Sequence, residues 1–316
     1  MMLADGFAKN RPAIIALAIV LVVFGIMPLI GSGYQVSIAT EILIFALLAM
    51  SIDVLAGYAG RTSLGHGAIF GASTYVVIYW TSAMGGSPLV AIILGVLVAV
   101  LVAAVFGFLA SRVSGVYFLL LTLALGMIVW GVALRWTSIS GGENGLRGVG
   151  RPEWLANATV FFYVCLATVV TLSAVIWRFV QSPFGLTLRG IRDSESRMSS
   201  LGYGCATHMF IAFTTTGFFA GVAGALYALF NNFVSPSTVQ LAQSVEGLLM
   251  AILGGIGTLF GAFIGAAAII LLENFVSQYT ARWPMVLGFM FIATMIFAPE
   301  GVLGAFRRFF RIRKKL

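Results

Sequence analysis

The side chains that could carry out catalysis or bind a metal are few and widely separated in this sequence. The only histidines are His66 and His208, and the only cysteines are Cys165 and Cys205. Neither pair has the spacing of a metal site, and no H-E-x-x-H or paired-carboxylate motif occurs. All lysines lie near the chain ends, outside glycine-rich stretches, which excludes a phosphate-binding P-loop. The sequence therefore predicts no enzyme, no metal site and no bound cofactor.

The elements that position these residues must be embedded in lipid. Of the 316 residues, 60% are hydrophobic and only 9% are charged, and the mean hydropathy is +1.06. Soluble domains carry about 25% charged residues, which form the hydrated surface that this chain lacks. Composition therefore excludes a soluble enzyme and a nucleic-acid-binding protein.

Ten apolar runs have about the length that a membrane-spanning helix needs, or somewhat less. They occupy residues 12–30, 36–56, 63–80, 88–110, 116–136, 158–178, 209–231, 243–256, 258–275 and 283–298. The first run shows no small-residue cleavage site after it, so we expect an uncleaved helix. The pattern predicts an all-α, polytopic helical bundle of about ten helices, with residues 1–316 forming a single transmembrane domain.

The distribution of basic residues predicts how this bundle is oriented in the membrane. Ten crossings place both termini on one side, and that side holds fourteen of the 18 Lys and Arg residues, against four on the other. Cytoplasmic loops collect basic residues, so both termini and the basic tail 305–316 are predicted to be cytoplasmic. The polar stretch 181–208 then lies inside, and the glycine-rich loop 137–157 lies outside.

Two glycine-broken segments interrupt the apolar runs, at 57–72 and at 254–257. Five of eight positions match between residues 65–72 and 255–262. Such segments can mark the binding region of a transporter built from repeats, or they can be independent close-packing faces. The residues that we assign to broken helices and a translocation path are Gly57, Gly60, Ser63, Gly65, His66, Gly67, Thr122, Gly254, Gly255 and Gly257.

Ionisable residues within the apolar runs each have two interpretations. Asp53 is either solvated near the interface or holds a broken segment through backbone amides. His66 either lines the path or donates a hydrogen bond to a freed carbonyl. Glu246 is expected to begin a helix at the outer face, where an acid complements the helix N-terminus, or else to act at an outer gate. Glu41 and Glu273 are expected at the interface.

The stretch 181–208 is the most polar part of the chain, with five charged residues between positions 189 and 197. It is predicted to be a short amphipathic element, since apolar positions recur among the charges. Pro183 and Gly185 are expected to break the preceding helix, and Leu201-Gly202 to end the element. Such an element can lie in a groove of a soluble partner, although an ordinary solvated loop is the simpler alternative.

An ordered series of motifs makes the interpretation specific. It comprises GYAGRTSLGHGAIFG (57–71), SGVYFLLLTLALG (114–126), SGGENGL (140–146), FGLTLRGIRDSES (184–196), GFFAGVAGALYA (217–228), FVSP (233–236), SVEGLLMAILGGIGTLFGAFIGA (244–266) and APEGVLG (298–304). In this order the motifs resemble the permease family of branched-chain amino acid ABC importers, in particular the M-type subunit. Leu186 and the stretch 196–200 depart from the family's usual basic and alanine-rich residues.

The resemblance implies a bacterial inner-membrane permease that works with several partners. These are two ABC ATPase subunits, which use ATP and Mg, a second and non-identical permease, and a periplasmic solute-binding protein. It implies that the ATPases contact a coupling loop whose residues here are Gly185, Arg189, Ile191, Arg192, Asp193, Ser194, Glu195, Leu201 and Gly202. It also implies that outer-face residues contact the binding protein, for which we select Gly142, Glu143, Asn144 and Glu246.

The implied cargo is a branched-chain or related neutral amino acid. The same importer architecture with urea, a short amide or an aromatic or other small organic acid is an alternative. An ion-coupled secondary transporter would need an ionisable relay near the membrane midplane, and the sequence offers none that is convincing.

Overall fold

The fold is known from a computed structural model that describes residues 20–28, 31–280, 282–297 and 301. Within these residues the chain is an all-α bundle, as predicted, and residues 20–28 form the described part of the first apolar run. The basic tail 305–316 and the start of the first run lie outside the described residues.

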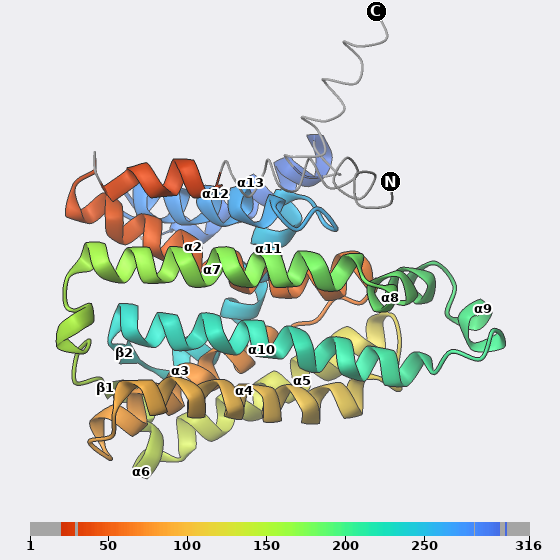
Figure 1. The fold of residues 1–316 in the computed structure, drawn as a ribbon, viewed down its shortest axis with the longest axis horizontal. Helices are drawn as coiled ribbons and strands as arrows, with labels where there is room; N and C mark the ends of the chain where they lie inside the picture. The colour runs from red at the N-terminus through yellow and green to blue at the C-terminus, as the bar shows by residue number, and fades with distance from the viewer. Residues whose placement is uncertain (1–19, 29–30, 281, 298–300, 302–316) are drawn as a thin grey trace, which may run out of the picture.

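The apolar runs become helices whose limits lie within a few residues of those predicted. The helices are α2 (Gly33–Asp53), α3 (His66–Ser82), α4 (Pro88–Ala110), α5 (Val116–Arg135), α7 (Ala158–Gln181), α10 (Cys205–Asn231), α11 (Leu241–Gly254), α12 (Gly261–Val276) and α13 (Trp283–Phe297). A π-helical turn, η1 (Val54–Tyr58), extends α2. In Figure 1 the long helices lie side by side along the longest axis of the molecule.

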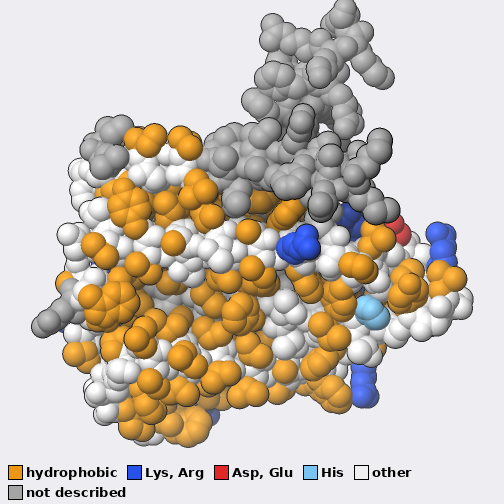
Figure 2. Space-filling view, in the orientation of Figure 1, with side chains coloured by type: hydrophobic (Ala, Val, Ile, Leu, Met, Phe, Trp, Pro, Cys, Tyr) orange, Lys and Arg blue, Asp and Glu red, His pale blue; other side chains and the backbone are white. Residues whose placement is uncertain are grey.

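Five helices in the described part of the chain are long and apolar enough to cross a membrane. They are α2 with its π-helical extension, α4, α5, α7 and α10. The outward face of α4 exposes a stripe of large apolar side chains that includes Ile93, Leu97 and Leu101. Figure 2 shows that the visible side of the bundle is largely hydrophobic, whereas most visible charged side chains gather at one end. This surface suits hydrocarbon rather than water.

Small residues let α10 pack closely against α3 and α4. A Cβ atom added at Gly217 or Gly221 would collide with Ala103 or Ala99 of α4, and one added at Gly224 would collide with the Phe70 carbonyl of α3. Hydroxyls reinforce this contact, since Ser73 Oγ donates to the Gly221 carbonyl at 2.7 Å. Polar side chains and small residues are the usual means of joining helices that have no hydrophobic drive to associate in lipid.

Both predicted loops contain additional ordered elements. The stretch 181–208 holds two helices, α8 (Pro183–Asp193) and α9 (Glu195–Ser200), which Figure 1 shows projecting from one end of the bundle. The loop 137–157 holds α6 (Thr137–Ser140), two short 3₁₀ turns, η2 (Gly142–Asn144) and η3 (Glu153–Leu155), and the strand β1 (Leu146–Arg147). Strand β1 pairs antiparallel with β2 (Phe233–Val234), and the turn η4 (Pro236–Val239) follows β2.

Candidate functional site

Two capping serines, Ser182 and Ser194, set where the two helices of the α8–α9 segment begin. The hydroxyl of Ser182 accepts a hydrogen bond from the Gly185 N–H, and Pro183 occupies the first position of α8. Ser194, in extended backbone, ends α8 and caps α9 by accepting from the Arg197 N–H. The expectation that Gly185 breaks the preceding helix is wrong, because the break lies at Ser182 and Gly185 packs against Val180 within α8.

The segment has one buried and one exposed face, as an amphipathic element should. Leu188 and Ile191 are buried against the bundle, whereas Leu186 and Leu201 are each 67% exposed. Gly202, with φ of +86°, follows α9 where the sequence placed the end of the element. Leu186 and Leu201 are therefore apolar side chains that this chain leaves uncovered, in contrast to the buried Leu188 and Ile191.

Three arginines tie this segment to the chain between Gly57 and Arg61. Arg192 donates to the Gly57 carbonyl, and its aliphatic stem fills the space that a side chain at Gly60 would need. The guanidinium of Arg189 lies 4.9 Å from the centre of the Tyr58 ring.

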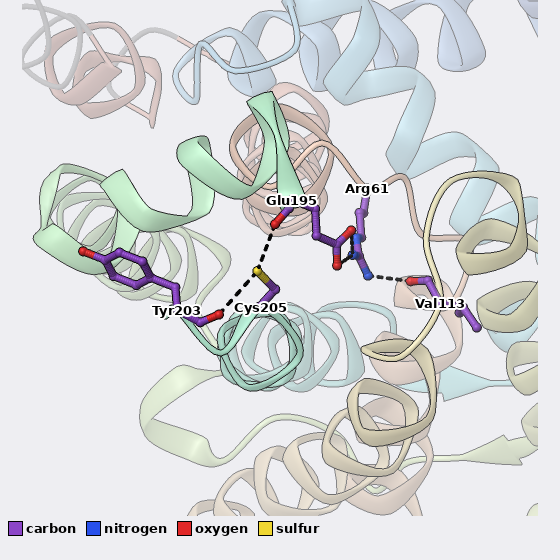
Figure 3. Close-up of polar contacts among 5 residues, drawn as sticks. All are labelled: Arg61, Val113, Glu195, Tyr203 and Cys205. Atoms are coloured by element: carbon purple, nitrogen blue, oxygen red, sulfur yellow. Dashed lines mark hydrogen bonds and ion pairs between the residues drawn. The ribbon is translucent and has the colours of Figure 1, made fainter. Parts of the chain in front are cut away.

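The third contact is an ion pair. Arg61 Nη2 lies 2.9 Å from both oxygens of the Glu195 carboxylate, and Arg61 Nη1 donates to the Val113 carbonyl, as Figure 3 shows. The Arg61 side chain is 5% exposed and that of Glu195 44%. Arg61 also lies over the Phe118 ring at 5.6 Å, so it joins α9 to the start of α5.

The two glycine-broken segments meet at a crossing next to these arginine contacts. A Cβ atom at Gly57 would collide with the backbone of Gly257. The buried carboxylate of Asp53 accepts hydrogen bonds from the N–H groups of Gly257 at 2.6 Å and Leu259 at 2.9 Å. Asp53 therefore holds a broken segment through backbone amides, and that segment is the one in the second half of the chain.

The second break depends on unusual backbone conformations. Gly255 and Gly257 have φ of +110° and +78°, and Leu259 has φ of +53°. A Cβ atom at Gly254 would collide with the Gly261 carbonyl, which lets α11 and α12 approach closely after the turn. The residues 65–72 and 255–262 that resemble each other both lie where a broken stretch leads into a helix, α3 or α12.

His66 lies at the start of α3 with both ring nitrogens engaged. Its Nε2 is 3.1 Å from Thr216 Oγ1, and its Nδ1 is 3.1 Å from Ser63 Oγ. Since the Thr216 hydroxyl donates to the Phe213 carbonyl, its oxygen is left as an acceptor toward His66 Nε2. The ring is fully buried within this chain.

Other residues predicted for the path surround the same loop. The Thr122 hydroxyl accepts from the Leu64 N–H at 3.1 Å, and a Cβ atom at Gly65 would press on the Phe106 ring. The Gly67 N–H donates to Ser244 Oγ at 2.9 Å, which joins α3 to α11. These contacts satisfy the backbone groups that the broken helix leaves free.

The loop 137–157 contains a tight glycine turn. Gly141, Gly142 and Gly145 all have positive φ, and Gly145 packs against the Val234 carbonyl. Glu143 and Asn144 lie on the exposed side of this turn. The turn is thus fixed against β2 while its polar side chains face outward.

Arg151, in the same loop, caps the C-terminal end of α10. Its guanidinium donates to the carbonyls of Leu229 and Phe230 and lies 4.0 Å from the centre of the Phe161 ring. Burial lowers the pKa of Arg151 from its ordinary value. A cation here complements the negative end of the α10 dipole.

The expectation that Glu246 begins a helix is wrong. Helix α11 begins at Leu241, so Glu246 lies beyond the first turn, where the helix N-terminus no longer acts on it. Instead Glu246 lies within electrostatic range of Glu41 on α2 and Glu273 on α12. These three carboxylates influence one another across α2, α11 and α12.

The structure thus brings together two of the predicted groups, the α8–α9 segment and the broken segments, and places Gly142, Glu143 and Asn144 at the opposite end of the bundle. The sequence interpretation missed Arg61, Thr216 and Ser244. Arg61 was treated only as a cytoplasmic charge. Its position inside a glycine-rich break, beside apolar runs, was the available signal.

The sequence profile of a family described as the branched-chain amino acid transport system permease component matches residues 34–298. This match covers the broken segments, the α8–α9 segment and most of the described bundle. The chain belongs to this family. It is therefore a multi-pass membrane permease.

Several curated relatives support the assignment. The permease is 27% identical to the high-affinity branched-chain amino acid transport system permease protein LivM of Salmonella typhimurium, covering 93% of this chain and 75% of the relative. It is 25% identical to LivH of Escherichia coli K12, covering 82% of this chain and 91% of the relative. It is also 25% identical to the autoinducer 2 import system permease protein LsrC of Photorhabdus laumondii, over 92% and 90%. No solved structure matches the chain.

Proposed function

We propose that this permease is a membrane-spanning subunit of an ATP-driven ABC importer in the bacterial inner membrane. It crosses the membrane about ten times with both termini in the cytoplasm, and it forms part of the translocation path. Energy comes from two separate ATPase subunits, which bind ATP and Mg, since this chain has no P-loop. A periplasmic binding protein delivers the solute to the face that carries Glu143 and Asn144.

The observation that carries this proposal is the α8–α9 segment. It projects from the end of the bundle where the visible basic side chains gather. The side chains of Leu186 and Leu201 are exposed on its surface. Leu186 lies on α8 and Leu201 directly follows α9, so each short helix carries an exposed apolar side chain. Exposed apolar side chains on amphipathic helices are the means by which such helices enter grooves of partner proteins. Its contacts with residues 57–61 connect that surface to the interior of the permease.

A second, related permease completes the path in this proposal. The chain resembles both LivM and LivH, which are two different permease proteins of one named transport system in Escherichia coli. Ser63, His66 and Thr122 are buried and hydrogen-bonded at the loop that leads into α3. We assign them to the path as groups that a movement of the broken helices would uncover. Uncharged groups of this kind suit a small zwitterion.

The proposed cargo is a branched-chain or related neutral amino acid, since the family and the LivM and LivH relatives carry that name. The relative LsrC is named for the import of autoinducer 2, so the competing class of cargo is another small polar solute. Solute binding by the partner binding protein separates these cargoes directly. Binding of leucine, isoleucine or valine supports the proposal, and binding of another small solute with no binding of amino acids contradicts the cargo assignment.

The ATPase contact is tested by making the exposed face polar. In Leu186→Ser combined with Leu201→Ser, we expect the co-expressed ATPase to be lost during purification, because the apolar side chains that would contact it are gone. Both substitutions leave the buried face of α8 intact, so the segment itself should stay folded. Met84→Ser, 59% exposed after α3, is the matched control and should retain the ATPase. Retention of the ATPase by the double variant, with undiminished ATP-dependent uptake, would show that the α8–α9 segment is not the docking site.

A further inference from the structure

The α8–α9 segment is held by the bundle in a specific way. Its contacts with residues 57–61 include three arginine side chains, which add directed contacts to the burial of Leu188 and Ile191 against the bundle. Arg61 contributes the contact with least access to water, since its side chain is 5% exposed and reaches both Glu195 and Val113. A guanidinium that contacts both oxygens of a carboxylate fixes orientation as well as distance.

The backbone of Arg61 belongs to the broken end of α2. Its N–H donates to the Leu55 carbonyl at 2.9 Å, so Arg61 is anchored to the π-helical turn η1. Gly60, with φ of +68°, separates η1 from the stretch that leads to Ser63 and His66. Movement of Glu195 would therefore be passed to η1 through one residue.

The same turn contacts the second broken segment. Gly57 lies against Gly257, and Asp53 accepts from the Gly257 and Leu259 N–H groups. Hydrogen bonds thus link α9 to Arg61 and Arg61 to η1. The close approach of Gly57 to Gly257 and the hydrogen bonds of Asp53, at the end of α2, then link this region to the turn between α11 and α12. The two broken segments are in direct backbone contact at their crossing, because there is no room for even a Cβ atom at Gly57.

We propose that Arg61 is a positioning residue for transport, which transmits displacement of α9 to the crossing of the two broken segments at Gly57 and Gly257. This inference rests on the proposed coupling of the α8–α9 segment to an ATPase. Arg61 itself faces the bundle and does not contact the ATPase. Its loss should therefore separate ATP hydrolysis from solute movement while both subunits stay assembled.

The test uses the complete transporter in proteoliposomes, with the permease, its partner permease, the ATPases and the binding protein. The measured quantity is solute uptake per ATP hydrolysed. In Arg61→Gln we expect ATPase binding and hydrolysis to stay near wild type, while uptake per ATP falls about tenfold, within the range of coupling between distant sites. Arg112→Gln removes an exposed cation that contacts only Phe108 among the described contacts, and it should change nothing.

Two further variants keep the outcome decisive if Arg61→Gln assembles poorly. Arg61→Lys retains the charge but not the paired donors, so uptake per ATP should lie between the wild type and Arg61→Gln. Adding Glu195→Gln to Arg61→Gln should lower the ratio no further, since the two residues act through one contact. A purely structural role would reduce uptake and hydrolysis together and leave their ratio unchanged, and that result would overturn the inference. If the wild-type permease binds no ATPase, the proposed function itself fails.

Discussion

The Asp53 carboxylate supplies two hydrogen bonds that the interrupted chain between α11 and α12 cannot make for itself. The N–H groups of Gly257 and Leu259 follow the end of α11 and point at its two oxygens. In a membrane interior no water is available to take over such groups, and each unpaired one costs several kcal/mol. Asp53 therefore acts as an acceptor for the second half of the chain, although it lies in the first.

Replacing Asp53 by asparagine should destabilise the permease. Asparagine replaces one of the two accepting oxygens by an amide nitrogen, which cannot accept from an N–H. One buried backbone donor therefore loses its partner, at a cost of about 1–3 kcal/mol. We expect a lower melting temperature for the detergent-solubilised Asp53→Asn protein. Asp193→Asn is the matched control, because the Asp193 side chain is 69% exposed and pairs with Arg192 only at 3.6 Å. Equal melting temperatures for the two variants would contradict the assigned role.

At the scale of elements, the breaks in α2 and between α11 and α12 depend on the absence of side chains at their crossing. The π-helical turn η1 places Gly57 against the backbone of Gly257. The positive φ values of Gly255 and Gly257 turn the chain after α11 toward Gly57. The crossing is thus a backbone-to-backbone contact, which a single methyl group would separate.

Gly57→Ala tests this contact without altering any hydrogen-bonding group. Its new methyl group would collide with the Gly257 backbone, and such overpacking costs about 1–3 kcal/mol. We expect both a lower melting temperature and a loss of uptake. Gly131→Ala, on α5 with no atom within 4 Å of the added Cβ, should be neutral or stabilise by up to about 1 kcal/mol through helix propensity. Similar behaviour of the two alanine variants would mean that the crossing tolerates separation.

The sequence predicted the helices well because length and apolarity alone define them in lipid. Residues 88–110 match α4 completely, with Ser87 before it and Pro88 at its first position. The division of 181–208 into α8 and α9 was not predicted, because Ser194 is one of several serines in this stretch and nothing in the sequence marks it as a cap. The Arg61–Glu195 pair joins positions 134 residues apart, and the two-residue ladder between β1 and β2 is too short to leave a pattern.

At the scale of the whole molecule, the two ends of the bundle differ in kind. One end carries α8 and α9 with their arginines and exposed apolar side chains, and the other carries β1, β2 and the glycine-rich turn. The positive-inside rule assigns the first end to the cytoplasm, since fourteen of 18 basic residues belong to that side in the ten-crossing topology. The proposed positions of the ATPase and the binding protein both depend on this orientation.

Cysteine labelling in cells measures the orientation directly. The native Cys165 and Cys205 are buried, so they should give little background. We expect a membrane-impermeant maleimide to label Val149→Cys in intact spheroplasts, because Val149 is 75% exposed in the outer loop. Ser196→Cys, exposed on α9, should be labelled only in inverted vesicles. Each variant serves as the control for the other, and the reverse pattern would place α8 and α9 outside the cell, where no ATPase could drive the crossing at Gly57 and Gly257.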